Sequence, residues 1–286
     1  MRWGALSEIY VPFKNGQPDF SKAKSEADFL ISKGVNGFYV NGIGAESLAL
    51  SIEERKKMLE SVLEASKGRY VIQNITDYRI DNTLLLASHA RDSGATHVLI
   101  SQHPVYSLNN LMQYYNTVAE KTDLPIILYN EKLLGQVLTP VTVSSVLTLE
   151  NFVGYKDSTR DIVHLLEVIE LMPKGKDIIA GSDSMIYETY VLGGSGIISL
   201  LINPFPELVI RIVDELENKN YESALLTQIK INRVRSILKS YGFSSGYREA
   251  CRLRGIDCGD PYLSTEKMTE KQREELEQKL MLEGLI

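Results

Sequence analysis

Short apolar runs alternate with longer amphipathic segments along the first three quarters of the chain. The runs have four to seven residues and are rich in Val, Ile and Tyr, which is typical of parallel strands buried on both faces. Eight such runs occur, at residues 5–11, 37–40, 70–75, 97–101, 125–129, 152–156, 177–180 and 196–201. An amphipathic segment follows each run, beginning near residues 20, 52, 81, 108, 140, 161, 184 and 206. Eight strand–helix units with no antiparallel segment between them predict a closed (β/α)8 TIM barrel rather than an open doubly wound sheet.

The last part of the chain has a different pattern. Its amphipathic segments, at residues 221–240, 247–254 and 269–282, are all helical in period, and no strand pattern separates them. We therefore predict a catalytic barrel over residues 1–218 and a C-terminal helical extension over residues 219–286.

Composition narrows the class of protein. Of 286 residues, 44% are apolar, which is ample for a large core. The net charge is −6 without a basic block, and no run approaches the roughly 18 apolar residues of a membrane helix, so we expect neither a nucleic acid nor a membrane as a partner. The chain has two cysteines, Cys251 and Cys258, too few for a disulfide framework, and its first residues lack a secretory signal. These features favour a metabolic enzyme of the cytoplasm.

Catalytic groups of such barrels lie at the C-terminal ends of the strands. Lys156 is the clearest candidate there, because it closes the apolar run at 152–156. Burial favours the neutral amine, which can attack a carbonyl group and form a Schiff base. The alternative is an ordinary strand-end lysine that is paired with Asp157 or Asp183.

Two further features lie at the same end of the predicted barrel. Tyr129 ends the neighbouring strand, and its phenol could transfer protons to and from a substrate on Lys156. The glycine-rich loop at 41–47 precedes the helix near residue 52, and its backbone N–H groups could bind a carboxylate. The alternatives are a tyrosine at the barrel rim and a plain tight turn.

A metal-dependent alternative needs clustered ligands. The histidines form no i, i+4 pair and no carboxylate-rich motif, so we predict no metal site; they are His89, His97, His103 and His164.

Taken together, these residues resemble the dihydrodipicolinate synthase / N-acetylneuraminate lyase superfamily of class I, pyruvate-dependent aldolases. The resemblance covers nearly the whole chain and rests on five motifs: Val11-Pro12-Phe13, Gly42 to Ser47, Tyr129-Asn130, Val153-Gly154-Tyr155-Lys156-Asp157-Ser158, and Gly193 to Ser199 with Asn203 beyond it. It implies that Lys156 forms the Schiff base with pyruvate and that Tyr129 transfers protons. It also implies a homo-oligomer, a tetramer or a dimer, and no cofactor besides the covalent pyruvate imine.

The resemblance also suggests which residues bind the substrate. With the family's two threonines replaced by Ile43 and Gly44, the pyruvate carboxylate is left to the N–H groups of Gly44 and Ala45, helped by Ser47. The other expected substrate-binding residues are Tyr106, Gly181, Ser182, Asp183, Ile198 and Asn203.

The departures from the family pattern guide the choice of reaction. The arginine that dihydrodipicolinate synthases use for a second carboxylate is missing from the loop after Asn130, and Asp183-Ser184 replaces the Asp-Glu pair of sialic acid lyases. Gly181-Ser182-Asp183 instead resembles the loop of 2-keto-3-deoxygluconate aldolases. We therefore predict an aldolase that cleaves or forms a 2-keto-3-deoxy sugar acid from pyruvate and an aldehyde. The alternatives are a dihydrodipicolinate synthase-like enzyme, another divergent Schiff-base lyase of the dehydratase or sialic acid lyase type, and a non-catalytic barrel that binds keto acids.

Overall fold

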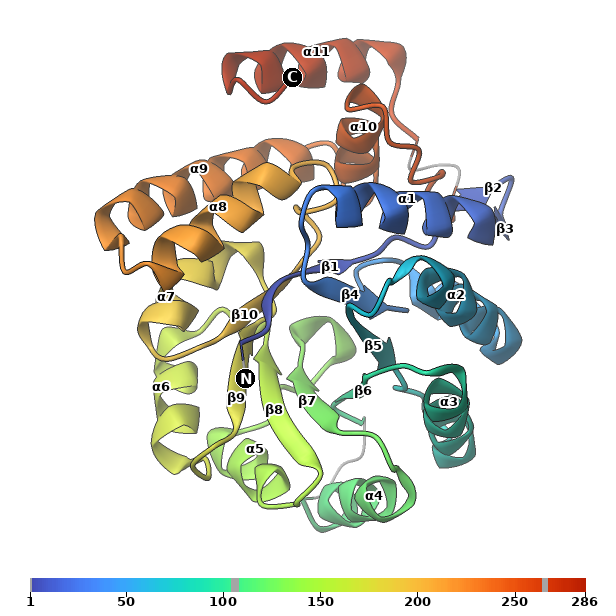
Figure 1. Ribbon diagram of the computed structural model, residues 1–286, viewed down its shortest axis with the longest axis vertical. Helices are drawn as coiled ribbons and strands as arrows, with labels where there is room; N and C mark the ends of the chain where they lie inside the picture. Colours follow the sequence, from blue (N-terminus) through green and yellow to red (C-terminus); the bar gives the residue numbers. More distant parts are fainter. Residues whose placement is uncertain (1, 104–107, 264–266) are drawn as a thin grey trace.

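The computed structural model describes residues 2–103, 108–263 and 267–286. Eight parallel strands close into a barrel in which β1 pairs with both β4 and β10 (Figure 1). The strands are β1 (Gly4–Glu8), β4 (Gly37–Val40), β5 (Tyr70–Asn74), β6 (His97–Ser101), β7 (Ile126–Asn130), β8 (Phe152–Asp157), β9 (Asp177–Ala180) and β10 (Gly196–Ser199). The predicted (β/α)8 barrel is thus confirmed.

Helices surround the strands and continue beyond them. Those of the barrel are α1 (Phe20–Ser32), α2 (Ile52–Ala65), α3 (Ile80–Ser93), α4 (Leu108–Lys121), α5 (Pro140–Leu147), α6 (Ile162–Leu171), α7 (Ile186–Val191) and α8 (Pro206–Glu217). The C-terminal extension consists of α9 (Tyr221–Lys239), α10 (Ser245–Leu253) and α11 (Glu270–Leu282), and α9 packs against α8 (Figure 1). Among the described residues, no helix has the length and apolarity needed to cross a membrane. The division of the chain at residue 218 stays a proposal, and the start of α9 at Tyr221 supports it.

A small hairpin contradicts the expectation that no antiparallel segment interrupts the pattern. Strands β2 (Phe13–Lys14) and β3 (Gln17–Pro18) pair antiparallel between β1 and α1. Asn15 and Gly16 connect them with positive φ values of 53° and 75°, and Asn-Gly is the preferred pair for a turn of this hand. The barrel itself is unaffected, because the hairpin lies outside the closed sheet.

The barrel interior forms a core of its own, separate from the larger core that includes the buried faces of the surrounding helices. It is filled by Trp3, which precedes β1, and by inward-pointing strand residues: Leu6, Tyr39, Ile72, Leu99, Ile127, Tyr129, Ile179 and Ile198. Tyr39 and Tyr129 lie toward the C-terminal ends of their strands, so the interior core ends in two phenol rings. These rings form part of the surroundings of Lys156.

Helix α10 is tied to the glycine-rich loop by a buried arginine. The Arg248 side chain has 0% exposure, and its Nη2 lies 2.6 Å from Glu46 Oε2 and 3.0 Å from the Val11 carbonyl oxygen. Ser244 Oγ donates to the same Glu46 oxygen at 2.7 Å. The extension therefore holds the loop that follows β4.

Replacing Arg248 by methionine is expected to lower the free energy of unfolding by about 3 kcal/mol, because Glu46 loses its charged partner inside the protein. Urea denaturation measures this change. The control is Arg233→Met, which removes a more exposed ion pair with Glu283 and should cost less than about 1 kcal/mol. Equal effects of the two substitutions would contradict the structural role of Arg248.

Candidate active site

Lys156 lies at the C-terminal end of β8, in register with Tyr129 of β7. Its side chain has 0% exposure, and its Nζ lies 3.9 Å from the centroid of the Tyr129 ring and 4.3 Å from that of Tyr39. Among the described residues, this nitrogen has no hydrogen-bond partner. Burial lowers the pKa of Lys156, although the nearby carboxyl groups, Glu8 foremost, act in the opposite direction. The site thus favours the neutral amine, the form that attacks carbonyl groups.

The acid beside Lys156 is Glu8, at the end of β1, and not Asp157 or Asp183, which the alternative interpretation of Lys156 named. Glu8 Oε2 lies 3.8 Å from Lys156 Nζ, and both side chains are buried. Burial raises the pKa of the Glu8 carboxyl, against the opposing effects of Lys156 and of backbone N–H groups. Burial disfavours the charged form of each group, whereas the attraction between the two charges favours it.

The glycine-rich loop is folded around the Glu8 carboxyl group. Ala45 N–H donates to Glu8 Oε1 at 3.1 Å. A Cβ atom at Gly42 would lie 2.2 Å from this oxygen, and one at Gly44 would lie 3.0 Å from it, so any larger residue at Gly42 would displace Glu8. The N–H group of Ala45, which the sequence assigned to a substrate carboxylate, thus bonds to the protein's own acid. The buried Ser47 hydroxyl bonds within the loop itself, where it donates to the Asn41 carbonyl oxygen at 2.7 Å.

Tyr129 belongs to a short chain of polar groups. Its hydroxyl donates to Glu131 Oε2 at 2.6 Å and lies 3.1 Å from Ser158 Oγ, which in turn donates to the Gly181 carbonyl at 2.8 Å. Burial, followed by the nearby acids Glu131 and Glu8, raises the pKa of Tyr129 well above its ordinary value. The phenol is therefore protonated at rest, and it can pass its proton to Glu131 while it accepts another one.

A cavity of about 380 Å³ adjoins the partners of Lys156 and Tyr129, although its lining does not include these two buried side chains themselves. Its lining includes Glu8, Glu131 and Ser158, together with the predicted residues Gly181, Ser182, Asp183 and Ile198. Asp183 accepts a hydrogen bond from Ser199 Oγ. Asn203, also predicted, instead supports the end of β1: its Nδ2 donates to the Glu8 carbonyl at 2.8 Å, and its Oδ1 accepts from Ser7 Oγ at 2.5 Å. Tyr106 lies outside the described residues.

Cations line another part of the same cavity. Arg160, Arg235 and Lys239 all belong to its lining. Burial and the neighbouring Arg235 and Arg160 lower the pKa of Lys239 to about 8. Such a group of cations is stabilised when an anionic ligand binds, because the ligand relieves their mutual repulsion.

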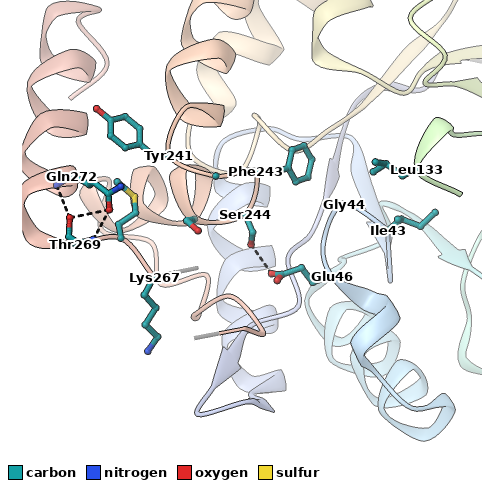
Figure 2. Close-up of a pocket in the computed structure, with 13 residues that line it drawn as sticks. Ile43, Gly44, Glu46, Leu133, Tyr241, Phe243, Ser244, Lys267, Thr269 and Gln272 are labelled. Carbon is teal, nitrogen blue, oxygen red and sulfur yellow. Dashed lines mark hydrogen bonds between the residues drawn. The ribbon is translucent and has the colours of Figure 1, made fainter. Parts of the chain in front are cut away.

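A second cavity, of about 600 Å³, adjoins the first, since Leu133 and Phe243 line both. Figure 2 shows this space between the glycine-rich loop, represented by Ile43, Gly44 and Glu46, and the C-terminal extension. Ser244 and Glu46 both line this cavity, and the hydrogen bond between them joins the extension to the loop (Figure 2). The extension therefore shapes the surroundings of the site as well as packing on the barrel.

Sequence reasoning missed three of the groups around Lys156. Glu8, Glu131 and Tyr39 come from or directly follow β1, β7 and β4, and no motif singled them out. A signal was available for Glu8: it is a charged residue at the C-terminal end of a buried strand, and so is Lys156. Among the described residues, no group of three or more His, Cys, Asp or Glu side chains is arranged to hold a metal ion.

Comparison with known proteins places the chain in a family. The model of the dihydrodipicolinate synthetase family matches residues 2–282. A 4-hydroxy-tetrahydrodipicolinate synthase of Syntrophus aciditrophicus is 30% identical over 99% of both chains. Among solved structures, dihydrodipicolinate synthase from Thermotoga maritima superposes with a TM-score of 0.92 at 26% identity over 100% of both chains. A 2-keto-3-deoxygluconate aldolase variant of Sulfolobus solfataricus, 23% identical over 98% of this chain and 96% of its own, shares the fold with a TM-score of 0.89. The chain therefore belongs to the dihydrodipicolinate synthetase family of pyruvate-dependent lyases.

Proposed function

We propose that the protein is a Schiff-base-forming class I aldolase in which Lys156 holds the substrate as a covalent imine. The observation that carries this proposal is the buried Lys156 amine, which has a lowered pKa and lies against the Tyr129 ring. A protonated imine withdraws electrons from the neighbouring carbon atoms and so acts as the electron sink of the reaction. The reaction then needs no cofactor besides the substrate bound to the lysine.

The proposed reaction begins when the Lys156 amine attacks the C2 ketone of the substrate and water is eliminated. The C3–C4 bond then breaks, and its electrons move into the protonated imine to give an enamine. Tyr129 accepts the proton of the C4 hydroxyl and passes its own to Glu131, which its hydroxyl already contacts at 2.6 Å. The enamine takes up a proton at C3, and hydrolysis releases pyruvate and the free amine.

For the substrate we propose a 2-keto-3-deoxy sugar acid, formed from or cleaved to pyruvate and an aldehyde. Polar lining groups support a fragment with several hydroxyl groups: Ser158, Ser182 and Asp183 could each bond to one of them. In this proposal Gly181 and Ile198 contact the same fragment.

A second candidate is the reaction of a dihydrodipicolinate synthase, in which pyruvate condenses with an aldehyde that carries a carboxylate of its own. The cations Arg160, Arg235 and Lys239 favour it, because they could bind this second carboxylate in place of the missing arginine. The relative from Syntrophus aciditrophicus is named for this activity.

A panel of 2-keto-3-deoxy acids tests the first candidate. We expect pyruvate release from at least one member, measured by coupling to lactate dehydrogenase, and no release by Lys156→Met. Condensation of pyruvate with aspartate semialdehyde, without cleavage of any keto-deoxy acid, would instead establish the second candidate. Turnover in neither assay would contradict both.

Assembly and location stay proposals too. We propose a homo-oligomer, a tetramer or a dimer, that acts in the cytoplasm. Both cysteines are buried as free thiols, which supports a reducing compartment. Light scattering at several protein concentrations measures the assembly.

A further inference from the structure

The Glu8 carboxyl group lies close to the Lys156 nitrogen, to which a keto-acid substrate would be joined. In an imine between Lys156 and C2 of such a substrate, the carboxylate carbon is two bonds from Nζ. Glu8 Oε2 is 3.8 Å from this nitrogen, and Glu8 Oε1 already uses the Ala45 N–H. Glu8 and the substrate carboxylate must therefore be neighbours. Whether they attract or repel each other affects how tightly the substrate binds.

Charge balance sets the form of Glu8 in this complex. The protonated imine carries one positive charge and the substrate carboxylate one negative charge, so the pair is neutral. An ionised Glu8, with 5% exposure, would leave these three groups with a net negative charge in a buried site. A protonated Glu8 adds none, and it presents a hydroxyl group.

We propose that Glu8, as a neutral carboxylic acid, donates its Oε2 hydroxyl to the carboxylate of the keto-acid substrate. It thereby supplies the hydroxyl that Ile43 and Gly44 cannot supply in the glycine-rich loop. This role rests on the proposed function, because it requires an imine on Lys156.

The surroundings of Glu8 hold it in the orientation that this role needs. Oε1 accepts from the Ala45 N–H, as the carbonyl oxygen of an acid does, which leaves Oε2 as the hydroxyl on the side of Lys156. Asn203 Nδ2 donates to the backbone carbonyl oxygen of Glu8 and so fixes the Glu8 backbone. We therefore assign Asn203 a positioning role. The absence of side chains at Gly42 and Gly44 makes room for the Glu8 carboxyl.

The neighbouring groups also favour the neutral acid. Burial raises the pKa of Glu8, and of its titratable neighbours Glu131 acts in the same direction, whereas Lys156 opposes it. The phenols of Tyr39 and Tyr129 stay neutral because burial raises the pKa of both. When Lys156 becomes a protonated imine, the substrate carboxylate beside it balances the new charge.

Borohydride trapping at increasing concentrations of pyruvate, and separately of acetone, tests the proposal. Acetone forms the same imine but has no carboxylate. Glu8→Ala should raise the half-saturating concentration of pyruvate by about 10- to 100-fold, the usual value of a hydrogen bond to a charged group, and should change that of acetone little. Glu8→Gln should restore most of the pyruvate affinity, because its amide N–H can donate in place of the hydroxyl.

The pH dependence provides a second measurement, which remains informative if Glu8→Ala does not fold. In the parent protein, the half-saturating concentration of pyruvate should increase as pH rises through the pKa of Glu8, since the hydroxyl is lost, and it should stay flat over that range in Glu8→Gln. Tighter pyruvate binding by Glu8→Ala would show that Glu8 competes with the substrate carboxylate, and an unchanged ratio of pyruvate to acetone would show a purely structural role. Either result would overturn the inference and leave the imine chemistry standing, whereas the absence of any adduct on Lys156 would overturn the proposed function itself.

Discussion

Replacing Lys156 by methionine is expected to lower kcat/KM by about 10⁴-fold or more, because no other group takes over covalent catalysis when the nucleophile is removed. The same substitution should leave the free energy of unfolding unchanged or raise it by about 1 kcal/mol. The reason is that Lys156 Nζ, among the described residues, has no hydrogen-bond partner to lose, and methionine keeps an apolar chain of similar length. Steady-state kinetics and urea denaturation measure the two effects.

Lys176→Met is the matched control. Lys176 Nζ donates to the carbonyl oxygens of Leu149 and Phe152, away from the cavity, so this substitution should reduce stability and leave turnover nearly unchanged. If Lys156→Met lost stability but kept its turnover, while Lys176→Met lost its turnover, Lys156 would be a structural residue.

Replacing Tyr129 by phenylalanine is expected to lower kcat by roughly 10² to 10⁴-fold, the usual contribution of a positioned acid–base group. The ring and its packing against Lys156 remain, so the barrel should stay folded. The substitution removes the hydroxyl that contacts Glu131 and Ser158 and so interrupts the proposed proton path. Pyruvate should still form an adduct with Lys156, since water can carry some of the protons.

Tyr155→Phe offers a matched comparison for Tyr129→Phe. Tyr155 is equally buried and lies next to Lys156 in sequence, but it belongs to the larger core, and its hydroxyl contacts Asn130 and His164. Removal of the Tyr155 hydroxyl should change kcat only by a few-fold. Near-normal turnover of Tyr129→Phe would remove the phenol from the mechanism.

The fold could be predicted from the sequence because its signals are local. Each buried strand is a short, mostly apolar run, and the eight runs lie within a few residues of the observed strands. Strand β1 ends at Glu8 rather than at Val11, because the backbone N–H of Val11 already bonds outside the sheet, to the Ala45 carbonyl oxygen. The hairpin at Asn15-Gly16 also had a local signal, which the count of apolar runs did not include.

The site could be predicted only in part, because half of its groups depend on closure of the barrel. Lys156 and Tyr129 end adjacent strands, so the rule for strand ends finds both. Glu8 approaches Lys156 because closure of the parallel sheet brings the C-terminal ends of β1 and β8 to the same end of the barrel, although β9 and β10 lie between these strands. In the sequence Glu8 is an acid near the N-terminus with no motif around it. Its role depends on contacts with Ala45 and Lys156, which are far away along the chain.

Trapping with pyruvate and borohydride tests the central claim most directly. Borohydride reduces an imine to a stable amine, so mass spectrometry of the digested protein locates the modified residue. The account predicts one reduced pyruvyl group per chain, on Lys156, and no modification of Lys156→Met. An adduct on a different lysine, or an unmodified protein after prolonged incubation, would contradict it.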